Sequence, residues 1–359
     1  MTMVRNKVFI EGVAMEISWR DATRSLSELI FTTVRKAVDD SGKSMESIDS
    51  VVLAAQDLVD GRSLSSMVTA PAAGAYLRDE IRFGDDGAAA FAAAVTRIEA
   101  GESKRSIVAA WARASEHDVE AVSRALFDPF FASPLGIDEA DIAAMRAQVW
   151  MREGGDCSNR AAAVRRREAS AAANPRALKS GGRRTAARYP LTDADLPRWA
   201  DFVVALVISP EPAKVKLAGM GQSSEPYWIG DRRLGELPGL RDAAGKALGE
   251  AGLAVADLDL VELDGLSLFD EAIGMEAIGL AAKGKGLDSL ANDARCNPSG
   301  GSGGGYCAPA MGLARIAEAV LQLQGRAGAV QIPGARKALA TGSSIVAGQT
   351  HTAIVLEAA

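Results

Sequence analysis

The chain contains Lys36-Ala-Val38, Gly42, Ile48-Asp49 and Val51, and the same pattern recurs 210 residues later as Lys246-Ala-Leu248, Gly252, Leu258-Asp259 and Val261. Each copy predicts an apolar-periodic helix that ends at a glycine suited to a left-handed conformation. A short polar turn follows, and an aspartate leads into a β-branched strand. The stretch therefore predicts a helix–turn–strand unit that occurs twice.

A second pair of segments repeats in the same order. Gly87, Ala94-Val95 and Ile98 match Gly312, Ala319-Val320 and Leu323. Strands that alternate with helices favour parallel sheet, and two such halves favour a layered α/β architecture. We expect an N-terminal half over residues 1–210, which carries an inserted cap at about 116–198, and a C-terminal half over residues 211–359.

Composition limits the class of protein. The chain has 359 residues, is 48% hydrophobic and carries a formal net charge of −6. It contains no apolar run near the roughly 18 residues of a membrane helix and no signal-peptide pattern, so we expect a cytoplasmic protein without a membrane partner. Three cysteines provide no disulfide framework, and two histidines are not spaced for a metal site.

The insert carries a concentration of positive charge. Between residues 160 and 188 there are nine basic side chains and one acidic side chain. Such a cluster in an acidic protein suggests a phosphate-bearing ligand. The alternative is a solvated helix face, whereas the acidic remainder of the chain disfavours nucleic acid.

Several motifs together resemble the thiolase superfamily, over nearly the whole chain. They are Gly87-Ala-Ala-Ala90-Phe91, Ala173-Asn174-Pro175-Arg176-Ala177, Tyr189-Pro190-Leu191-Thr192, Asn297-Pro-Ser-Gly300-Gly301 with Gly305-Tyr306, and Gln322-Leu323-Gln324-Gly325. The resemblance implies an αβαβα arrangement of duplicated halves with an inserted cap, and a coenzyme A thioester as ligand. It further implies that the insert receives the nucleotide end of coenzyme A, for which Arg165, Arg166, Arg183, Gly300 and Gly301 are the candidate residues.

The chain departs from that family at its catalytic positions. Gly84 falls where a thiolase has its nucleophilic cysteine, Tyr306 falls where it has a histidine, and the segment 340–344 contains no cysteine. The spacing of the loop 262–269 has also changed. Ordinary cysteine-based Claisen chemistry is therefore not expected. Cys307 is an alternative nucleophile, although packing is the commoner role of a small cysteine in a glycine-rich turn; Cys296 is expected to pack and His117 to make a structural hydrogen bond.

Two hypotheses of function follow from this comparison. In the first, the chain is a degenerate subunit, either a homodimer or a heteromer with a cysteine-bearing thiolase paralogue or a zinc-ribbon and OB-fold protein. In the second, it resembles thiolase-like retro-aldolases and cleaves a β-hydroxyacyl-CoA, with Tyr306 as acid or base and Asp86 or Asp264 as its partner. Asp85 and Asp86 have the alternative role of capping a helix that begins near Gly87. A ketosynthase-type role is a third possibility, since those proteins share the duplicated fold.

Overall fold

The computed structural model describes residues 7–61 and 66–359. Its strands are β1 (Phe9–Ser18), β2 (Ser50–Ala54), β3 (Asp79–Phe83), β4 (Ser106–Arg113), β5 (Asp201–Ser209), β6 (Val215–Ser224), β7 (Leu260–Glu262), β8 (Lys337–Ser343) and β9 (Thr350–Ala358). Its helices are α1 (Leu26–Ser41), α2 (Asp57–Asp60), α3 (Ser66–Thr69), α4 (Gly87–Glu99), α5 (Val119–Leu126), α6 (Glu139–Arg152), α7 (Arg160–Ala173), α8 (Pro238–Ala251), α9 (Leu268–Ala277), α10 (Gly286–Asn292) and α11 (Met311–Leu323).

The described strands form one sheet in the order β3-β2-β4-β5-β1-β6-β9-β8-β7. Counted outward from the middle of the sheet, the N-terminal half has the order β1-β5-β4-β2-β3. The C-terminal half has the equivalent order β6-β9-β8-β7. An isolated parallel bridge between Val261 and Cys296 lies beside β7, where the N-terminal half has β3. The two halves join where β1 pairs antiparallel with β6 at Phe9 and Ile10. The duplication predicted from the sequence is therefore a duplication of topology.

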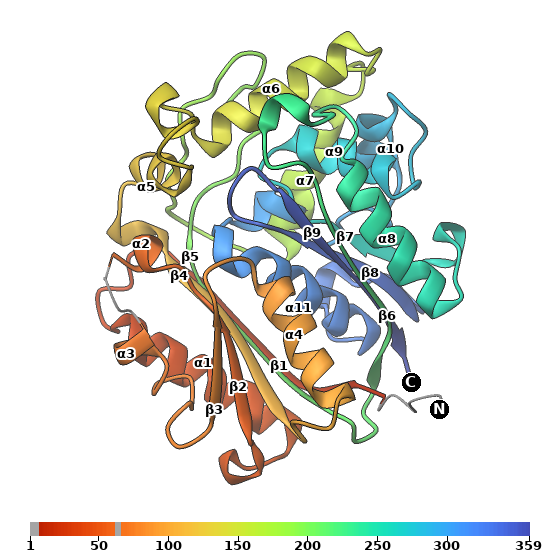
Figure 1. Cartoon of the computed structure of the whole chain (residues 1–359). Coiled ribbons are helices and arrows are strands. Elements are labelled where there is room, and N and C mark those ends of the chain that lie inside the picture. The colour runs from red at the N-terminus through yellow and green to blue at the C-terminus, as the bar shows by residue number, and fades with distance from the viewer. Residues whose placement is uncertain (1–6, 62–65) are drawn as a thin grey trace.

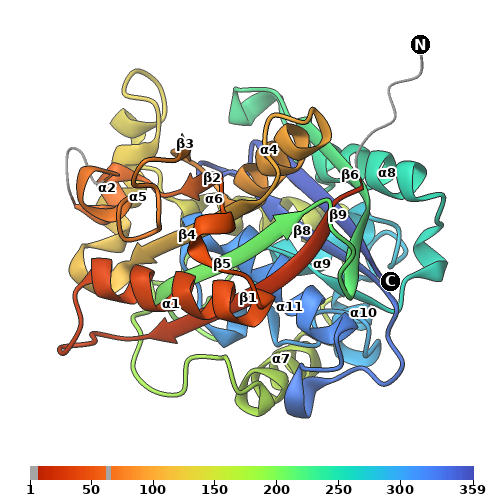
Figure 2. The same cartoon turned by 90° about the horizontal axis from the view of Figure 1, so that it is seen from below.

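The helices form layers around this sheet, as Figures 1 and 2 show. Helix α1 packs on β1 and β5, and α8 packs on β6 and β9. Helices α4 and α11 pack against each other between the two parts of the sheet, with α4 on β2 and β4 and α11 on β8. The strand residues alternate accordingly: Val51 and Leu53 belong to the core under α1, and Val52 and Ala54 to the central core. This is the predicted αβαβα arrangement.

In each half, a glycine at an equivalent position allows the outer helix to pack closely on a bulged strand. Gly12 and Gly219 both follow a shift in strand register. A Cβ on Gly12 would lie 2.1 Å from the carbonyl oxygen of Ala37, and a Cβ on Gly219 would lie 2.1 Å from that of Ala247. Ala37 and Ala247 are equivalent positions of the sequence repeat. The repeated Lys-Ala segment is therefore explained by close helix-to-strand contact, which leaves no room for a side chain on the strand.

The repeated aspartate caps the neighbouring strand. Asp49 accepts hydrogen bonds from the backbone N–H groups of Lys104 (2.7 Å) and Arg105 (3.1 Å), where β4 begins. Asp259 accepts from Arg336 (2.8 Å) and Lys337 (2.9 Å), where β8 begins. In each half the carboxylate satisfies donors that have no partner in the sheet. The aspartate of the repeat thus fixes which strand is placed beside β2 and β7.

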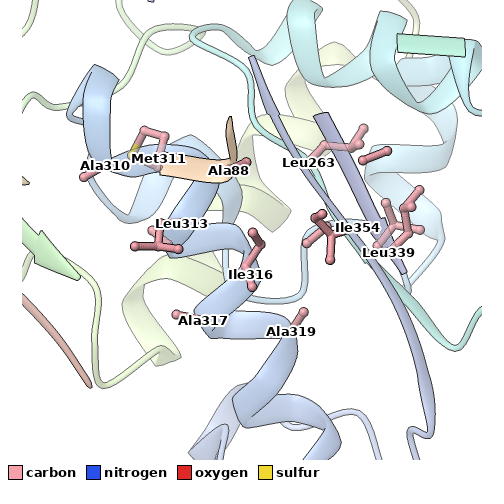
Figure 3. Close-up of a cluster of buried hydrophobic side chains, with 14 of the residues drawn as sticks. Ala88, Leu263, Ala310, Met311, Leu313, Ile316, Ala317, Ala319, Leu339 and Ile354 are labelled. Carbon is pink, nitrogen blue, oxygen red and sulfur yellow. The ribbon is translucent and has the colours of Figure 1, made fainter. Parts of the chain in front are cut away.

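Helix α11 is the centre of the molecule, and every one of its residues is buried. Figure 3 shows its apolar side chains, including Leu313 and Ile316, between Ala88 of α4 and Leu339 and Ile354 of the sheet. The three polar residues of α11 are buried with partners: Arg315 pairs with Glu262, Glu318 with Arg176, and Gln322 donates to the Val330 carbonyl. The second pair of repeated sequence segments therefore forms the two central helices, α4 and α11.

The insert folds between β4 and β5 and contains α5, α6 and α7, which lie at the upper end of the molecule and behind it in Figure 1. Its Asn-Pro motif attaches it to the core. The buried Asn174 side chain donates to the carbonyl oxygen of Ser299 (3.1 Å) and to Glu318 of α11 (2.9 Å). Arg176 completes the contact through an ion pair with Glu318 (2.6 Å).

No helix in the described ranges is long and apolar enough to cross a membrane. Strand β5 ends at Ser209 and β6 begins at Val215. The proposed division of the chain into units at residue 210 remains a prediction.

Candidate active site

A small buried cavity lies where the two halves and the cap meet. Its volume is ≈ 40 Å³. Asp264 follows β7, Tyr306 belongs to the glycine-rich loop before α11, and the segment 341–348 comprises the end of β8 and the loop that follows it. Glu139 and Arg146 enter from α6 of the cap. Two of the three predicted catalytic residues, Tyr306 and Asp264, therefore line the same cavity.

Tyr306 is held in place by its backbone and by one ring contact. Its N–H donates to Arg198 (2.9 Å), its carbonyl accepts from Ala200 (2.9 Å), and its ring packs edge-to-face against Trp199 at 5.0 Å. The Tyr306 hydroxyl has no hydrogen-bond partner among the described residues. Burial, reinforced by the carboxylates of Asp264 and Glu139, raises the pKa of Tyr306 well above its usual 10. The phenol stays protonated at neutral pH, so it can donate a hydrogen bond but cannot act as a base.

Asp264 has one satisfied oxygen and one without a partner. Its Oδ2 accepts from the N–H (3.1 Å) and the hydroxyl (2.8 Å) of Ser343, the last residue of β8. Its Oδ1 is buried and has no hydrogen-bond partner among the described residues. Burial raises the pKa of Asp264 to about 6, against the lowering effect of the bonds from Ser343. A carboxylate that titrates near 6 is ionised at neutral pH and can accept a proton.

Asp86 does not line the cavity. It is the N-cap of α4, where one oxygen accepts from the Ala88 N–H (2.8 Å), and its other oxygen accepts from the Gly312 N–H of α11 (2.8 Å). A Cβ at Gly312 or Gly342 would lie within 2.2 Å of this carboxylate. Burial and the nearby Asp264 raise the pKa of Asp86, although the two helix N-termini favour its ionised form. The capping role predicted for Asp86 is confirmed, and it extends to a second helix.

Asp85 has a different role from the predicted cap. Its Oδ1 accepts from the Ile345 N–H at 2.7 Å and so fixes the loop after β8. The half-buried His117 has an Nδ1 without a hydrogen-bond partner among the described residues, and burial lowers its pKa. It lies with Cys307 in a second small pocket, mainly apolar, which shares Glu139 and Trp199 with the cavity.

The cap clamps the same loop through a residue in an unusual conformation. Ala347 has a φ of 51°, a region that residues other than glycine seldom adopt. Glu139 accepts from the Ala347 N–H (2.6 Å), and Arg146 donates to the Ala347 carbonyl (2.8 Å) while it pairs with the buried Asp270 (3.0 Å). Burial raises the pKa of Glu139 to about 7. These two residues could not be predicted from the sequence, because α6 shows only an amphipathic pattern, which does not indicate the loop that it contacts.

A basic groove is lined in part by the residue that precedes Trp199 of the cavity. Arg198 lies on the groove and its neighbour Trp199 on the cavity. The groove has a volume of ≈ 440 Å³ and presents four cations, namely Arg167, Lys179, Arg184 and Arg198. Each donates to backbone carbonyls, and none forms an ion pair within the described part of the chain. Glu168 also lines the groove, and Arg167 is within electrostatic reach of Glu168, Asp195 and Glu271, so the groove is basic on balance rather than wholly uncompensated.

The residues predicted to bind coenzyme A do not line this groove. Arg165 is exposed, Arg166 donates to the carbonyls of Leu290 (2.5 Å) and Cys296 (2.7 Å), and Arg183 forms an ion pair with Asp118 (3.5 Å). The predicted segment supplies most of the groove, but through neighbouring positions that helix and loop geometry turn inward. Spacing alone does not distinguish Arg166 from Arg167.

Gly300 and Gly301 shape the loop that carries Tyr306. Both have positive φ angles, 95° and 52°. A Cβ on Gly300 would lie 2.5 Å from the backbone nitrogen of Ala171 in α7, and a Cβ on Gly301 would lie 2.6 Å from Glu271. These glycines are buried against the cap and the core, and Gly303 is the glycine that reaches the groove.

Comparison with known proteins agrees with this architecture. Residues 221–357 match the family model described as thiolase C-terminal domain-like. The protein has the thiolase fold, and the match of its C-terminal residues agrees with the resemblance to the thiolase superfamily that the sequence motifs carry. A search of curated proteins finds no match.

Solved structures with this fold cover almost the whole chain. The structure of an Ltp2-ChsH2(DUF35) aldolase is 20% identical over 99% of this chain and 98% of that chain, with a TM-score of 0.79. A monomeric SCP2-thiolase-like protein type 1 from Mycobacterium smegmatis is 18% identical over 99% of this chain and 78% of that chain, with a TM-score of 0.67. Human mitochondrial 3-ketoacyl-CoA thiolase is 14% identical over 99% and 100%, with a TM-score of 0.70. These likenesses establish the fold.

This thiolase-fold protein has no reactive thiolate among its described residues. Gly84 lies exposed between β3 and α4, and nothing lies within 4 Å of the position of its missing Cβ. Burial raises the pKa of Cys296 to about 12, raises that of Cys307 well above 9, and also raises that of Cys157. Since the thiolate is the nucleophile, all three thiols are unreactive at neutral pH. The packing role of Cys296 and Cys307 is therefore the better account.

Proposed function

We propose that this protein cleaves a carbon–carbon bond in a β-hydroxyacyl-CoA thioester by a retro-aldol reaction. The observation that carries the proposal is that one cavity is lined both by Asp264, whose buried Oδ1 has no hydrogen-bond partner among the described residues, and by Tyr306, whose hydroxyl stays protonated and can donate a hydrogen bond. A retro-aldol step requires a base and a donor for the enolate oxygen, and it requires no acyl-enzyme. The site offers the first two groups and lacks a thiolate.

The roles follow from the two pKa values. Ionised Asp264 takes the proton of the β-hydroxyl, the electron pair of that O–H bond forms the carbonyl, and the bond between the α- and β-carbons breaks. The electrons of that bond form an enolate, whose oxygen accepts a hydrogen bond from Tyr306. Protonated Asp264 then returns the proton to the α-carbon. The products are a ketone or aldehyde and a shortened acyl-CoA, so atoms and charge balance.

The basic groove supports a coenzyme A thioester as the substrate. Arg167, Lys179, Arg184 and Arg198 supply positive charge and form no ion pair within the described part of the chain, which suits the phosphates of a nucleotide. Arg198 of the groove directly precedes Trp199 of the cavity in the chain, and we propose that the nucleotide lies in the groove while the thioester reaches Tyr306. We assign the nucleotide to these four residues in preference to Arg165, Arg166 and Arg183.

The alternative role, a degenerate subunit in a heteromeric complex, is supported by the absence of a reactive thiolate and by one comparison. The Ltp2-ChsH2(DUF35) aldolase is a complex of two kinds of protein, so the fold occurs in such assemblies. We propose that this chain also works with a partner, for which a zinc-ribbon and OB-fold protein is the expected class. A complex of this kind is compatible with the retro-aldol chemistry.

Purified protein, with any partner retained by gentle isolation from its own host, tests the proposal. We expect release of a carbonyl product and a shortened acyl-CoA from β-hydroxyacyl-CoA thioesters, detected by mass spectrometry. Tyr306→Phe should lower kcat by about 10²- to 10³-fold, as loss of one oxyanion donor does. Tyr76→Phe removes a hydroxyl from an exposed tyrosine and serves as the matched control. Full activity of Tyr306→Phe in the complex would support the degenerate-subunit role instead.

A further inference from the structure

Trp199 lines the cavity with an indole N–H that the chain leaves without an acceptor. The residue is 6% exposed, and its Nε1 is buried and has no hydrogen-bond partner among the described residues. The other two buried tryptophans both use this group. Trp150 donates to Glu276 (2.9 Å), and Trp111 donates to Asp60 (3.3 Å). A buried indole N–H usually has a partner, and its absence costs free energy, so the exception at Trp199 requires an explanation.

Other nitrogen atoms of the cavity lining without a hydrogen bond belong to side chains that are held elsewhere. They are the Nε of Arg146 and the Nε2 of His351. Arg146 bonds to Asp270 and to a backbone carbonyl through its two terminal nitrogens, and the His351 Nε2 lies 3.5 Å from the Oε1 of Glu225. An indole has a single polar atom. Trp199 therefore makes no side-chain hydrogen bond within the described part of the chain.

Backbone bonds hold Trp199 beside Tyr306. Trp199 forms a parallel bridge with Tyr306 and an antiparallel bridge with Arg183. The Trp199 N–H of the backbone donates to the Arg183 carbonyl (2.7 Å), and the Arg183 N–H donates to the Trp199 carbonyl (3.2 Å). Bridged strands lie about 4.8 Å apart, and their paired residues project to the same side. The Trp199 and Tyr306 side chains therefore start from adjacent points, and both line the cavity.

This position suits a second donor for the oxygen that becomes negative in the reaction. An indole N–H donates and never accepts, so Trp199 cannot act as a base. One oxygen accepts from two donors when each lies about 2.7–3.1 Å from it, which requires donor atoms at most about 6 Å apart. The rings of Trp199 and Tyr306 have centroids 5.0 Å apart, which is close enough for this arrangement.

We infer that the indole N–H of Trp199 is a second donor to the enolate oxygen, beside the Tyr306 hydroxyl. This inference adds a residue to the proposed function and rests on it. The thioester oxygen accepts both hydrogen bonds when the substrate binds. Both bonds strengthen as the bond between the α- and β-carbons breaks and negative charge moves onto that oxygen. The buried N–H thus gains in the complex the acceptor that the chain does not supply.

Steady-state cleavage of the β-hydroxyacyl-CoA that the wild-type protein turns over fastest tests the role of Trp199. Trp199→Phe keeps a ring and removes the N–H, so it should lower kcat by about 10²-fold, as loss of one oxyanion donor does. KM should stay within about threefold, because the bond gains most of its strength in the transition state. Trp228→Phe is the matched control, since Trp228 is 44% exposed and does not line the cavity. An unchanged kcat for Trp199→Phe would overturn the inference and leave the proposed function intact.

Exchange of the α-hydrogens of butyryl-CoA in D₂O, followed by mass spectrometry, tests the donors without bond cleavage. Butyryl-CoA has no β-hydroxyl, but its exchange passes through the corresponding enolate. Trp199→Phe should slow the exchange at least tenfold, in the wild-type background and again in a Tyr306→Phe background. No further slowing in the second background would show that Trp199 only positions Tyr306 and would overturn the inference, as would a wild-type protein that catalyses no exchange.

The two assays separate the inference from the proposed function. Exchange that depends on Trp199, in a protein that cleaves no β-hydroxyacyl-CoA, would refute the retro-aldol reaction and retain Trp199 as a donor to an enolate. Cleavage and exchange that both depend on Trp199 would support the two proposals together.

Discussion

Replacement of the proposed base should make the protein more stable while it removes activity. Ionised Asp264 is buried, and a rise of its pKa from 3.8 to about 6 corresponds to about 3 kcal/mol of destabilisation at pH well above 6. The sign follows from linkage. Because the folded-state pKa is raised, the stability present below pH 3.8 is lost as the pH rises through 6. Asp264→Asn cannot ionise and does not incur this loss.

The geometry makes asparagine a suitable replacement at this position. The amide oxygen can accept from Ser343 in place of Oδ2, and the NH₂ group takes the place of Oδ1, which has no partner among the described residues. Relative to wild type, we expect Asp264→Asn to gain about 1 kcal/mol at pH 4.5 and about 3 kcal/mol at pH 8. The increase of about 2 kcal/mol between these values is independent of any constant effect of the substitution.

Urea unfolding at the two pH values measures this difference, with Asp39→Asn, an exposed carboxylate on α1, as the matched control. Asp86→Asn provides a contrast, since both oxygens of Asp86 accept backbone N–H groups. An amide NH₂ would face a donor there, and we expect a loss of about 1–3 kcal/mol. If Asp264→Asn is no more stabilised at pH 8 than at pH 4.5, or retains full kcat, Asp264 is not the buried base that we describe.

Three further predictions concern the same structure. The activity should rise with pH through about 6 as Asp264 ionises, and an acidic limb absent from the pH–rate profile would contradict its role as base. Arg146→Met removes the hold on Ala347 and leaves Asp270 unpaired, so we expect a loss of about 3–5 kcal/mol in urea unfolding, with Arg233→Met, 74% exposed, as control. Gly219→Ala should destabilise the protein by more than about 2 kcal/mol, whereas Gly249→Ala, where a Cβ meets nothing within 4 Å, should be neutral or stabilising.

The fold could be predicted from the sequence because the repeated residues are ones that the backbone needs at fixed places, such as strand caps and helix ends. The offset between Asp49 and Asp259 marks two strand caps, and the glycines Gly42 and Gly252 both end a helix at a φ of 67°. Such constraints act within one half and leave a fixed spacing in the chain. The join between β1 and β6 left no such signal, because two short antiparallel contacts demand no particular residue type.

The candidate site was predictable only in part, for a related reason. Tyr306 and Asp264 occupy motif positions, so their places along the chain indicated a role. Glu139 and Arg146 act through a loop that is about 200 residues distant in sequence, and only the packed structure reveals the contact. The choice among the basic residues of α7 depends on helix rotation, which places Arg167 inward and Arg165 outward.

The position of Asp86 bears on which group can donate a hydrogen bond to the enolate oxygen. The N-termini of α4 and α11 converge on this one carboxylate, which accepts the N–H groups of Ala88 and Gly312. Helix N-termini are the natural binding sites for developing negative charge, but the Asp86 carboxyl group already occupies these two. An enolate formed in the cavity must therefore rely on a side chain. Among the donors of the cavity that have no bonding partner within the described chain are the Tyr306 hydroxyl and the Trp199 Nε1–H, and the proposed chemistry assigns the enolate oxygen to Tyr306.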